Sequence, residues 1–308
     1  MPRKQKPPKW SDADDSDELF YEDDADLNDE VYSQVKISRI DRTSDKEREK
    51  KKRKREDSRT VEAVLDLSTS KEISRLISKG YFRGLGGVVS TGKEANVYHA
   101  YGAGHEEAVG MAELAVKVYR TRTLDFRKIK TYIYGDIRFQ KTGRKSHQII
   151  QTWALKEFKN LRRAFDADIR VPKPVVVRRN VLVLEFLGTN GIPAYHLRHL
   201  ALEDEEFYYE LLEDLLGQVR RLWTEARLVH GDLSAYNILF HDDKPYIIDM
   251  GQAVVTDHNL AEAFLLRDLQ NLLNYFDNAP VGQTPSPEEV FEEITGNPVR
   301  EQFTDLNP

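Results

Sequence analysis

The sequence predicts an α+β fold with two lobes, a small β-rich lobe followed by a reduced, α-rich lobe. Short β-branched and aromatic segments at 96–100, 114–119, 175–177 and 181–186 read as strands. Apolar residues recur at helical spacing in 147–164, 204–227, 259–276 and 286–295. The chain has 308 residues, of which 40% are hydrophobic, so it can bury the core of such a domain.

The first part of the chain differs from the rest in charge. Residues 11–30 are rich in Asp and Glu, and residues 46–55, KEREKKKRKR, form a basic block. Such blocks bury too little apolar surface to order themselves, so we predict a disordered charged tail over 1–57. We expect an N-terminal lobe over 58–187 and a C-terminal lobe over 188–308.

The first helix of the N-terminal lobe is expected over 70–79. Thr69 would be its N-cap, and Glu72, three residues later, would complete a capping box. Gly80 is placed to end this helix in a left-handed conformation.

Composition excludes several classes of protein. The chain has no cysteine, so disulfides and thiolate chemistry are absent. No apolar run approaches the ~20 residues that span a bilayer, and the first ten residues lack the apolar core of a signal peptide. A net charge of −6 argues against a DNA-coating protein. We therefore expect a cytoplasmic protein without membrane contact.

The stretch GGVVSTGKEANVYHA, residues 86–100, resembles a Walker A loop at first sight. Glu94, however, stands where a P-loop needs a hydroxyl for Mg²⁺, and a strand pattern follows where a P-loop opens a helix. We predict instead a strand–loop–strand cover whose backbone approaches a triphosphate. Its nucleotide-binding candidates are Ser90, Thr91, Gly92 and Lys93. On these residues alone an ordinary hairpin turn is the favoured interpretation, and the rest of the chain has to decide.

The densest polar cluster lies in LVHGDLSAYNILFHDDKPYIIDMGQA, residues 228–253. Asp232 and Asn237 have the spacing of a kinase catalytic loop, in which the Asp faces the acceptor hydroxyl and the Asn takes a metal ion. Asp249 ends an apolar strand beside a glycine. Asn237 and Asp249 would supply the oxygen ligands that Mg²⁺ prefers, and Mn²⁺ is an alternative. Each residue alone fits an ordinary turn, but their order together favours phosphoryl transfer.

Residues upstream fit the same chemistry. Lys117 lies inside an apolar strand, where a lysine is costly to bury unless it is paired. Glu157 is the only acid in the helix 147–164 and is the predicted ion-pair partner, so that Lys117 would meet the α/β-phosphates of ATP. Glu185 and Leu187 flank the end of a strand before a glycine turn. They suit a hinge that pairs with adenine, with an ordinary strand end as the alternative.

Taken together, these motifs resemble those of the RIO family of atypical serine protein kinases, most closely its type-one subfamily in an archaeal-type form. The resemblance covers about residues 58–295 and implies a two-lobed, protein-kinase-like fold with a C-terminal catalytic lobe. It is carried by STGKEANVYHA (90–100), AVKVY (115–119), WALKEFKNLRR (153–163), LVHGDLSAYNIL (228–239) and YIIDMGQAV (246–254).

The resemblance also implies a function. It implies ATP binding, serine autophosphorylation with Asp232 as proton acceptor, and an ATPase cycle in maturation of the small ribosomal subunit, with precursor particles of rRNA and protein as partners. It further implies that Asp249 can form an aspartyl-phosphate. Gly231 replaces the arginine of H-R-D and no A-P-E follows Asp249, so we expect neither an activation-loop switch nor a peptide platform.

Three points remain open at this stage. The basic and aromatic segment 120–146 suits a mobile loop that contacts RNA, or a merely solvated one. A small-molecule kinase of the aminoglycoside or choline type shares the H-G-D…N and I-D-x-G arrangement. The protein could also be an assembly scaffold in which ATP acts as a conformational switch.

Overall fold

The computed structural model of the chain describes residues 65–120, 129, 131–133, 135–139, 143 and 145–300. All of them fall within the unit that spans Ile40–Pro308. The predicted tail 1–57 lies outside the described residues, and the predicted lobe boundaries at residues 57 and 187 stay predictions.

The first described helix, α2 (Leu67–Ser78), begins earlier than the sequence predicts. Asp66 is its N-cap, and its carboxylate accepts a hydrogen bond from the Thr69 backbone N–H at 2.7 Å. Thr69 therefore lies inside the helix, and the predicted cap at Thr69 is wrong because the more acidic acceptor stands three residues earlier. Gly80 has φ +81° directly after the C-cap, as predicted.

The N-terminal lobe is built on one antiparallel sheet. Within the described residues its strands run in the order β1-β2-β3-β5-β4. Their bounds are Phe82–Thr91 (β1), Ala95–Gly102 (β2), Glu113–Tyr119 (β3), Pro174–Arg178 (β4) and Val181–Glu185 (β5). A short 3₁₀ turn, η4 (Glu106–Ala108), precedes β3.

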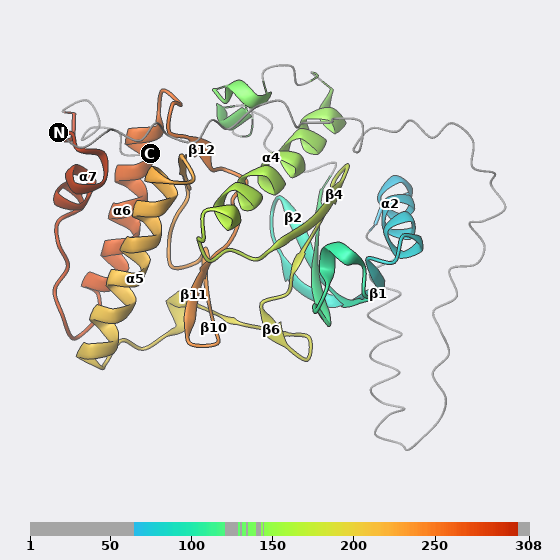
Figure 1. The fold of residues 1–308 in the computed structure, drawn as a ribbon, viewed down its shortest axis with the longest axis horizontal. Coiled ribbons are helices and arrows are strands. Elements are labelled where there is room, and N and C mark those ends of the chain that lie inside the picture. The colour runs from blue at the N-terminus through green and yellow to red at the C-terminus, as the bar shows by residue number, and fades with distance from the viewer. Residues whose placement is uncertain are drawn as a thin grey trace, which may run out of the picture. The chain divides into compact units, whose positions relative to one another are not determined.

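The two faces of this sheet are covered by different helices. Along β5, Leu182 and Leu184 join the core that includes α4 (Ser146–Asp166), while Val181 and Val183 join a cluster with α2. Successive side chains of a strand point to opposite faces, so the sheet is a layer between the two helices. Figure 1 shows α2 and α4 on opposite sides of the sheet.

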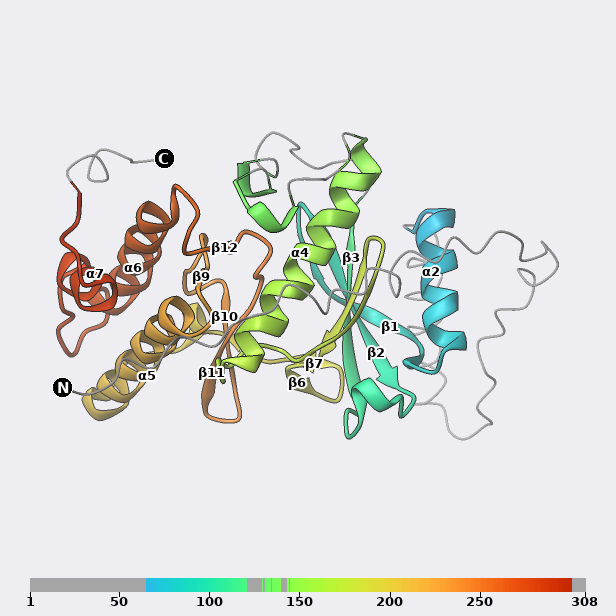
Figure 2. The same ribbon diagram turned by 45° about the horizontal axis from the view of Figure 1, so that its top comes forward.

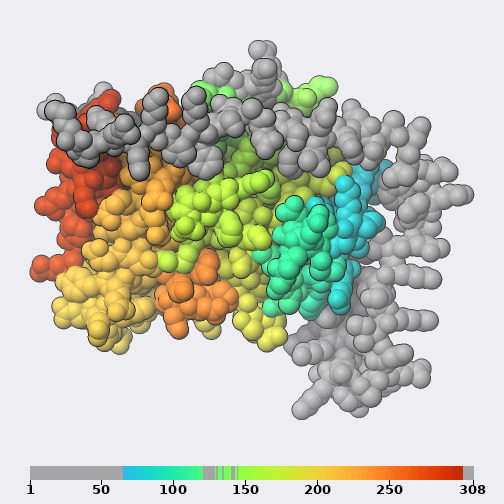
Figure 3. All heavy atoms as spheres, in the orientation of Figure 1, coloured from blue at the N-terminus to red at the C-terminus, as the bar shows by residue number. Residues whose placement is uncertain are grey.

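The C-terminal lobe consists mainly of helices α5 (Glu205–Thr224), α6 (Ala261–Asp277) and α7 (Pro287–Thr295). Asp204 caps α5, which ends three residues before the predicted limit, and Ser286 caps α7 in a capping box. Figure 2 shows these helices grouped apart from the sheet, with α4 between them and β1–β3. Figure 3 shows the atoms of α4 and the strands after it exposed in the middle of one face, beside α5.

Short strands connect the two groups of elements and carry the polar loops of residues 228–253. They are β6 (Gly188–Thr189), β7 (Ile192–Pro193), β8 (Tyr195–His196), β9 (Leu228–Val229), β10 (Ile238–His241), β11 (Lys244–Ile247) and β12 (Val254–Val255), with the 3₁₀ turn η6 (Leu197–His199) after β8. β11 pairs with β10, β10 with β8, β12 with β9, and β6 with β7, all antiparallel. The predicted two-lobed α+β architecture is confirmed.

The segment between β3 and α4, for which the sequence leaves open a mobile RNA-contacting loop and a merely solvated one, is described only in part. Tyr132 is 7% exposed and Phe139, in the 3₁₀ turn η5 (Ile137–Phe139), is 6% exposed. Tyr132 packs against the rings of Trp153 and Phe264. These two aromatic side chains belong to the core and are not available to stack on RNA bases. No described helix is long and apolar enough to cross a bilayer.

Candidate active site

The predicted phosphate cover is a β-hairpin. β1 and β2 pair with Ser90 opposite Val97 and Thr91 opposite Asn96, and the Gly92 N–H closes the turn on the Ala95 carbonyl at 2.9 Å. Residues 90–93 are all exposed at the tip. A strand follows the turn, so the P-loop arrangement is excluded.

Lys117 is central to the candidate site. It lies in β3 beside Val97 of β2. Its Nζ donates to both carboxylate oxygens of Glu157 in α4 at 2.8 Å, and to Oδ1 of Asp249 at 2.9 Å. Glu157 is 1% exposed, whereas half of the Asp249 side chain is exposed. The structure thus contains the ion pair that the sequence predicts and adds Asp249 as a second partner.

The cluster around Lys117 contains more acidic groups than basic ones. Burial lowers the pKa of Lys117, but Asp249 and Glu157 outweigh burial and raise it above its ordinary value. Burial raises the pKa of Glu157 to about 7, although Lys117 opposes this. For Glu94, burial and repulsion by Asp249 raise the pKa. Lys117 thus pairs with two carboxyl groups, and Glu94 adds a third acidic group to the same electrostatic environment.

The catalytic-loop candidates come from the turn between β9 and β10. Asp232 is exposed, and its Oδ2 accepts a hydrogen bond from Nε2 of Gln252 at 2.9 Å. Asn237 donates through Nδ2 to the Asp232 backbone carbonyl at 2.8 Å. This bond fixes the turn and orients the amide, so the Asn237 Oδ1 oxygen is the atom suited to coordinate a cation.

Backbone hydrogen bonds bring this turn next to the strand end that carries Asp249. The Ile248 N–H donates to the Asn237 carbonyl at 2.9 Å, and Nε2 of His230 lies 3.0 Å from the Ile248 carbonyl oxygen. Burial opposes ionisation of Asp249, but the Lys117 charge outweighs burial and lowers its pKa. Asp249 is therefore a carboxylate at neutral pH, next to Asn237.

The predicted hinge residues occupy the end of β5. The Glu185 N–H donates to the Lys173 carbonyl at 2.9 Å, and its side chain accepts from the Lys173 N–H at 3.1 Å. The Leu187 carbonyl accepts from the Ala194 N–H at 2.9 Å. The Glu185 side chain thus braces the neighbouring strand, and any contact with adenine would fall to backbone groups.

Sequence reasoning missed Asp268 of α6. Asp268 is 1% exposed and accepts the backbone N–H groups of Gly231 at 2.7 Å and Leu233 at 2.8 Å, on either side of Asp232. Burial raises its pKa to about 6 against the opposing effect of His230 and these hydrogen bonds. The sequence does contain a sign of this role. Asp268 is an acid among leucines on the apolar face of a helix, and an acid buried there needs hydrogen-bond partners.

The donor set fits a magnesium ion. Mg²⁺ prefers oxygen ligands and is held in proteins by one or two carboxylates together with phosphate oxygens and water. Asp249 offers a carboxylate and Asn237 an amide oxygen on adjoining backbone segments. Among the described residues, no three His, Asp or Glu side chains form a preformed metal cluster.

Comparison with known proteins gives consistent matches. The family model "RIO domain" matches residues 96–288. The RIO-type serine/threonine-protein kinase Rio1 of Haloferax volcanii is 40% identical over 236 residues, which cover 77% of this chain and 77% of that protein. The Rio1 kinase of Methanocaldococcus jannaschii is 38% identical over 280 residues, covering 89% of this chain and 92% of that protein.

A solved structure supports the fold. The Rio2 kinase from Chaetomium thermophilum superposes with a TM-score of 0.53 at 21% identity, covering 71% of this chain and 65% of that chain. The fold is thus kinase-like, with a reduced C-terminal lobe. The names of the relatives favour a protein kinase over the small-molecule kinase considered above. The chain belongs to the RIO domain family and is a Rio1-type serine/threonine-protein kinase of the archaeal kind.

Proposed function

We propose that this kinase binds Mg–ATP between the β1–β2 hairpin and the loops that carry Asp232 and Asp249. The observation that carries the proposal is the position of Lys117, whose Nζ lies within 2.9 Å of both Glu157 and Asp249. A lysine held in this way can meet phosphate oxygens while Asp249 faces the cation beside them. The kinase then transfers the γ-phosphoryl group to a serine or, transiently, to Asp249.

The remaining roles follow from placement. Residues 90–93, which are exposed at the hairpin tip, cover the phosphates. Backbone groups of Glu185 and Leu187 other than those bonded to Lys173 and Ala194 pair with adenine. Asn237 and Asp249 would hold Mg²⁺, or Mn²⁺ in its place. The ion supplies charge neutralisation for the β- and γ-phosphates when it is bound.

The two acceptors need different help from Asp232. With a serine acceptor, a bond forms between the hydroxyl oxygen and the γ-phosphorus, the bond to the β,γ-bridging oxygen breaks, and the hydroxyl proton passes to Asp232. With Asp249 as acceptor there is no proton to remove. A carboxylate oxygen of Asp249 bonds to the γ-phosphorus as the bond to the β,γ-bridging oxygen breaks. Asp232 then orients a water molecule and takes its proton as the water oxygen attacks phosphorus, and the bond from phosphorus to the Asp249 oxygen breaks, which releases inorganic phosphate and restores the carboxylate.

We further propose that this cycle serves maturation of the small ribosomal subunit in the cytoplasm. The family resemblance motivates this, and the basic block 46–55 supplies cationic side chains suited to rRNA phosphates. ATP turnover would then time release from the precursor particle.

The test follows the label from γ-labelled ATP. Wild-type enzyme is quenched, and the labelled protein is treated with hydroxylamine, which cleaves acyl phosphates and leaves phosphoserine intact. We expect a hydroxylamine-sensitive fraction that disappears in Asp249→Asn, and a loss of turnover on the order of 10²–10⁴ in Asp232→Asn with nucleotide binding retained. Label that is entirely hydroxylamine-resistant would reject the aspartyl-phosphate and leave serine phosphorylation alone.

A further inference from the structure

Two polar side chains of α4 hold the backbone that follows Asp249. Lys156 is fully buried, and its Nζ donates to the Gly251 carbonyl at 2.9 Å and also to the Ala253 carbonyl. Asn160 is equally buried, and its Nδ2 donates to the carbonyls of Met250 and Ala253 at 2.9 Å. Three of the four carbonyls after Asp249 therefore bond to one helix.

The orientation of the Asn160 amide is fixed from its other side. Arg138 donates through Nη2 to Asn160 Oδ1 at 2.8 Å, so Nδ2 must face the carbonyls. Arg138 is itself fixed by Asp136, which is fully buried and accepts from Nε at 2.9 Å and from Nη2 at 2.6 Å. A continuous polar network thus runs from residues 136–138 through α4 to residues 250–253.

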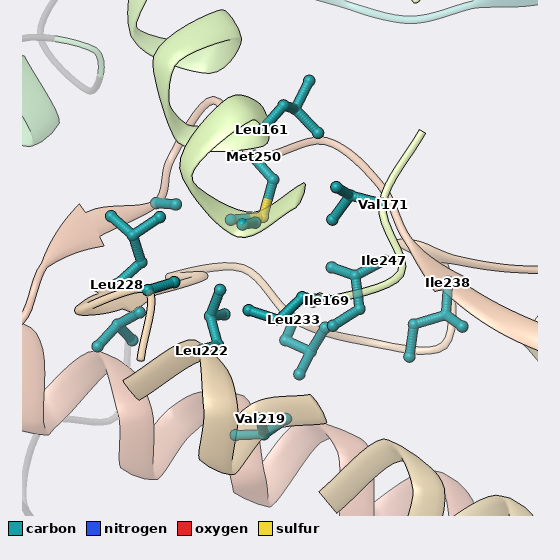
Figure 4. Close-up of a cluster of buried hydrophobic side chains, with 14 of the residues drawn as sticks. Leu161, Ile169, Val171, Val219, Leu222, Leu228, Leu233, Ile238, Ile247 and Met250 are labelled. Carbon is teal, nitrogen blue, oxygen red and sulfur yellow. The ribbon is translucent and has the colours of Figure 1, made fainter. Parts of the chain in front are cut away.

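Apolar contacts fix the same loop. Met250 is fully buried, and Figure 4 shows its side chain in the cluster of buried apolar residues that also includes Leu161 of α4. A Cβ on Gly251 would lie 3.3 Å from the ring of Trp153, so the backbone passes close to that indole. Asp249 itself has φ +63°, a left-handed conformation that non-glycine residues keep only where surrounding contacts enforce it.

We propose that Lys156 and Asn160 are positioning residues for the metal ligand Asp249, and that Asp136 and Arg138 act on Asp249 through Asn160. The inference rests on the proposed role of Asp249 in binding Mg²⁺. Since Glu157 neighbours Lys156 on α4, one helix fixes both the phosphate-binding lysine and the metal ligand. Contacts made by residues 136–138, in the connection between β3 and α4, would then influence the geometry of the metal site.

The test measures the Mg²⁺ concentration that gives half-maximal ATP turnover, at fixed ATP. The variants are Asn160→Asp, which is isosteric but turns an acceptor toward the carbonyls, Lys156→Met and Arg138→Met. Arg162→Met is the control, because Arg162 is exposed on the same helix. ADP binding in excess EDTA and the thermal midpoint are measured for every variant.

We expect Asn160→Asp and Lys156→Met to raise the half-saturating Mg²⁺ concentration about tenfold, the equivalent of one buried carbonyl left without a donor. Only one is left in each variant, because the Ala253 carbonyl keeps its other donor. Arg138→Met should shift it in the same direction by less. Excess Mg²⁺ should restore turnover, and binding of metal-free ADP should be unchanged. A purely structural role would lower the thermal midpoint and the turnover without moving the Mg²⁺ dependence, and that result would overturn the inference.

Asp249→Asn separates this inference from the proposed function. This variant is compared through the Mg²⁺ dependence of ADP binding, because Asp249 itself takes part in turnover. If Asp249→Asn keeps the wild-type Mg²⁺ dependence of ADP binding, the proposed metal site itself is wrong. If Asp249→Asn shifts that dependence while Asn160→Asp, folded and active, does not, only the positioning role fails. Should Lys156→Met not fold, Asn160→Asp and Arg138→Met carry the test.

Discussion

Replacing Lys156 by methionine should change how the stability of this protein depends on pH. Burial, together with the charge of Arg138, lowers the pKa of Lys156 from 10.5 to about 7, although Asp136 opposes this. In the unfolded chain the lysine keeps its ordinary pKa. Between pH 7 and 10.5 the unfolded state therefore binds a proton that the folded state lacks, and wild-type stability rises with pH over this window.

The size of the effect follows from the gap between the two pKa values. That gap corresponds to about 5 kcal/mol in full, or about 1.4 kcal/mol for each pH unit inside the window. Near pH 7 the folded-state group is already half titrated. The free energy of unfolding of the wild type, relative to Lys156→Met, should therefore rise by about 2 kcal/mol from pH 7 to pH 9.

Urea unfolding at pH 7, 8 and 9 measures this difference for the wild type, Lys156→Met and the control Arg162→Met. The slopes of free energy against urea should agree among the three proteins, so that midpoints report stability. The control should follow the wild type at every pH. Parallel pH curves for the wild type and Lys156→Met would refute the reasoning, because Lys156 would then stay protonated in the folded state.

Three further predictions concern the active site and the tail. Glu157→Gln removes the buried carboxyl group that pairs with Lys117 and should lower ATP turnover about tenfold. Lys117→Met should lower turnover further, and equal rates for the wild type and both variants would contradict the assigned ion pair. Asp268→Asn leaves one buried backbone N–H without an acceptor and should lower the free energy of unfolding by about 1–3 kcal/mol in thermal denaturation at pH 7, with a loss of turnover. A chain that starts at Ser58 should keep the ATP turnover and ATP affinity of the full chain, and failure of this chain to bind ATP would show that the tail takes part in the site.

The site residues that could be predicted are those whose partners or spacing can be recognised in the sequence itself. A lysine inside an apolar strand needs a partner, and helix 147–164 offers a single acid, so Lys117 and Glu157 could be paired across 40 residues of sequence. Asp232, Asn237 and Asp249 lie in one short stretch whose strands and turns fix their spacing. The relative positions of these three residues are therefore set by the short segment that joins them.

The parts that could not be predicted depend on contacts distant in sequence. Lys156 and Asn160 occur in KEFKNLRR, which reads as the charged outer face of a helix. Their partners are backbone carbonyls about ninety residues away, and backbone carbonyls have no signature in the sequence. A signal was available, since Lys156 and Asn160 fall three and seven residues after Trp153 and so share its buried face. For helix α2, the competing cap Asp66 stood three residues before the predicted one.

Together these contacts indicate why α4 is built from so many polar residues. Glu157 fixes Lys117 in the β-sheet lobe, while Lys156 and Asn160 fix the loop after Asp249. A rotation of α4 that broke one set of contacts would break the other, because residues 156, 157 and 160 lie within about one helical turn. The hydrogen bonds from Lys156 and Asn160 are buried, so breaking them would leave carbonyls without donors. Lys117 and Asp249, for which we propose phosphate binding and metal binding, are therefore expected to stay in register. This would not need the arginine of H-R-D, in whose place this chain has Gly231.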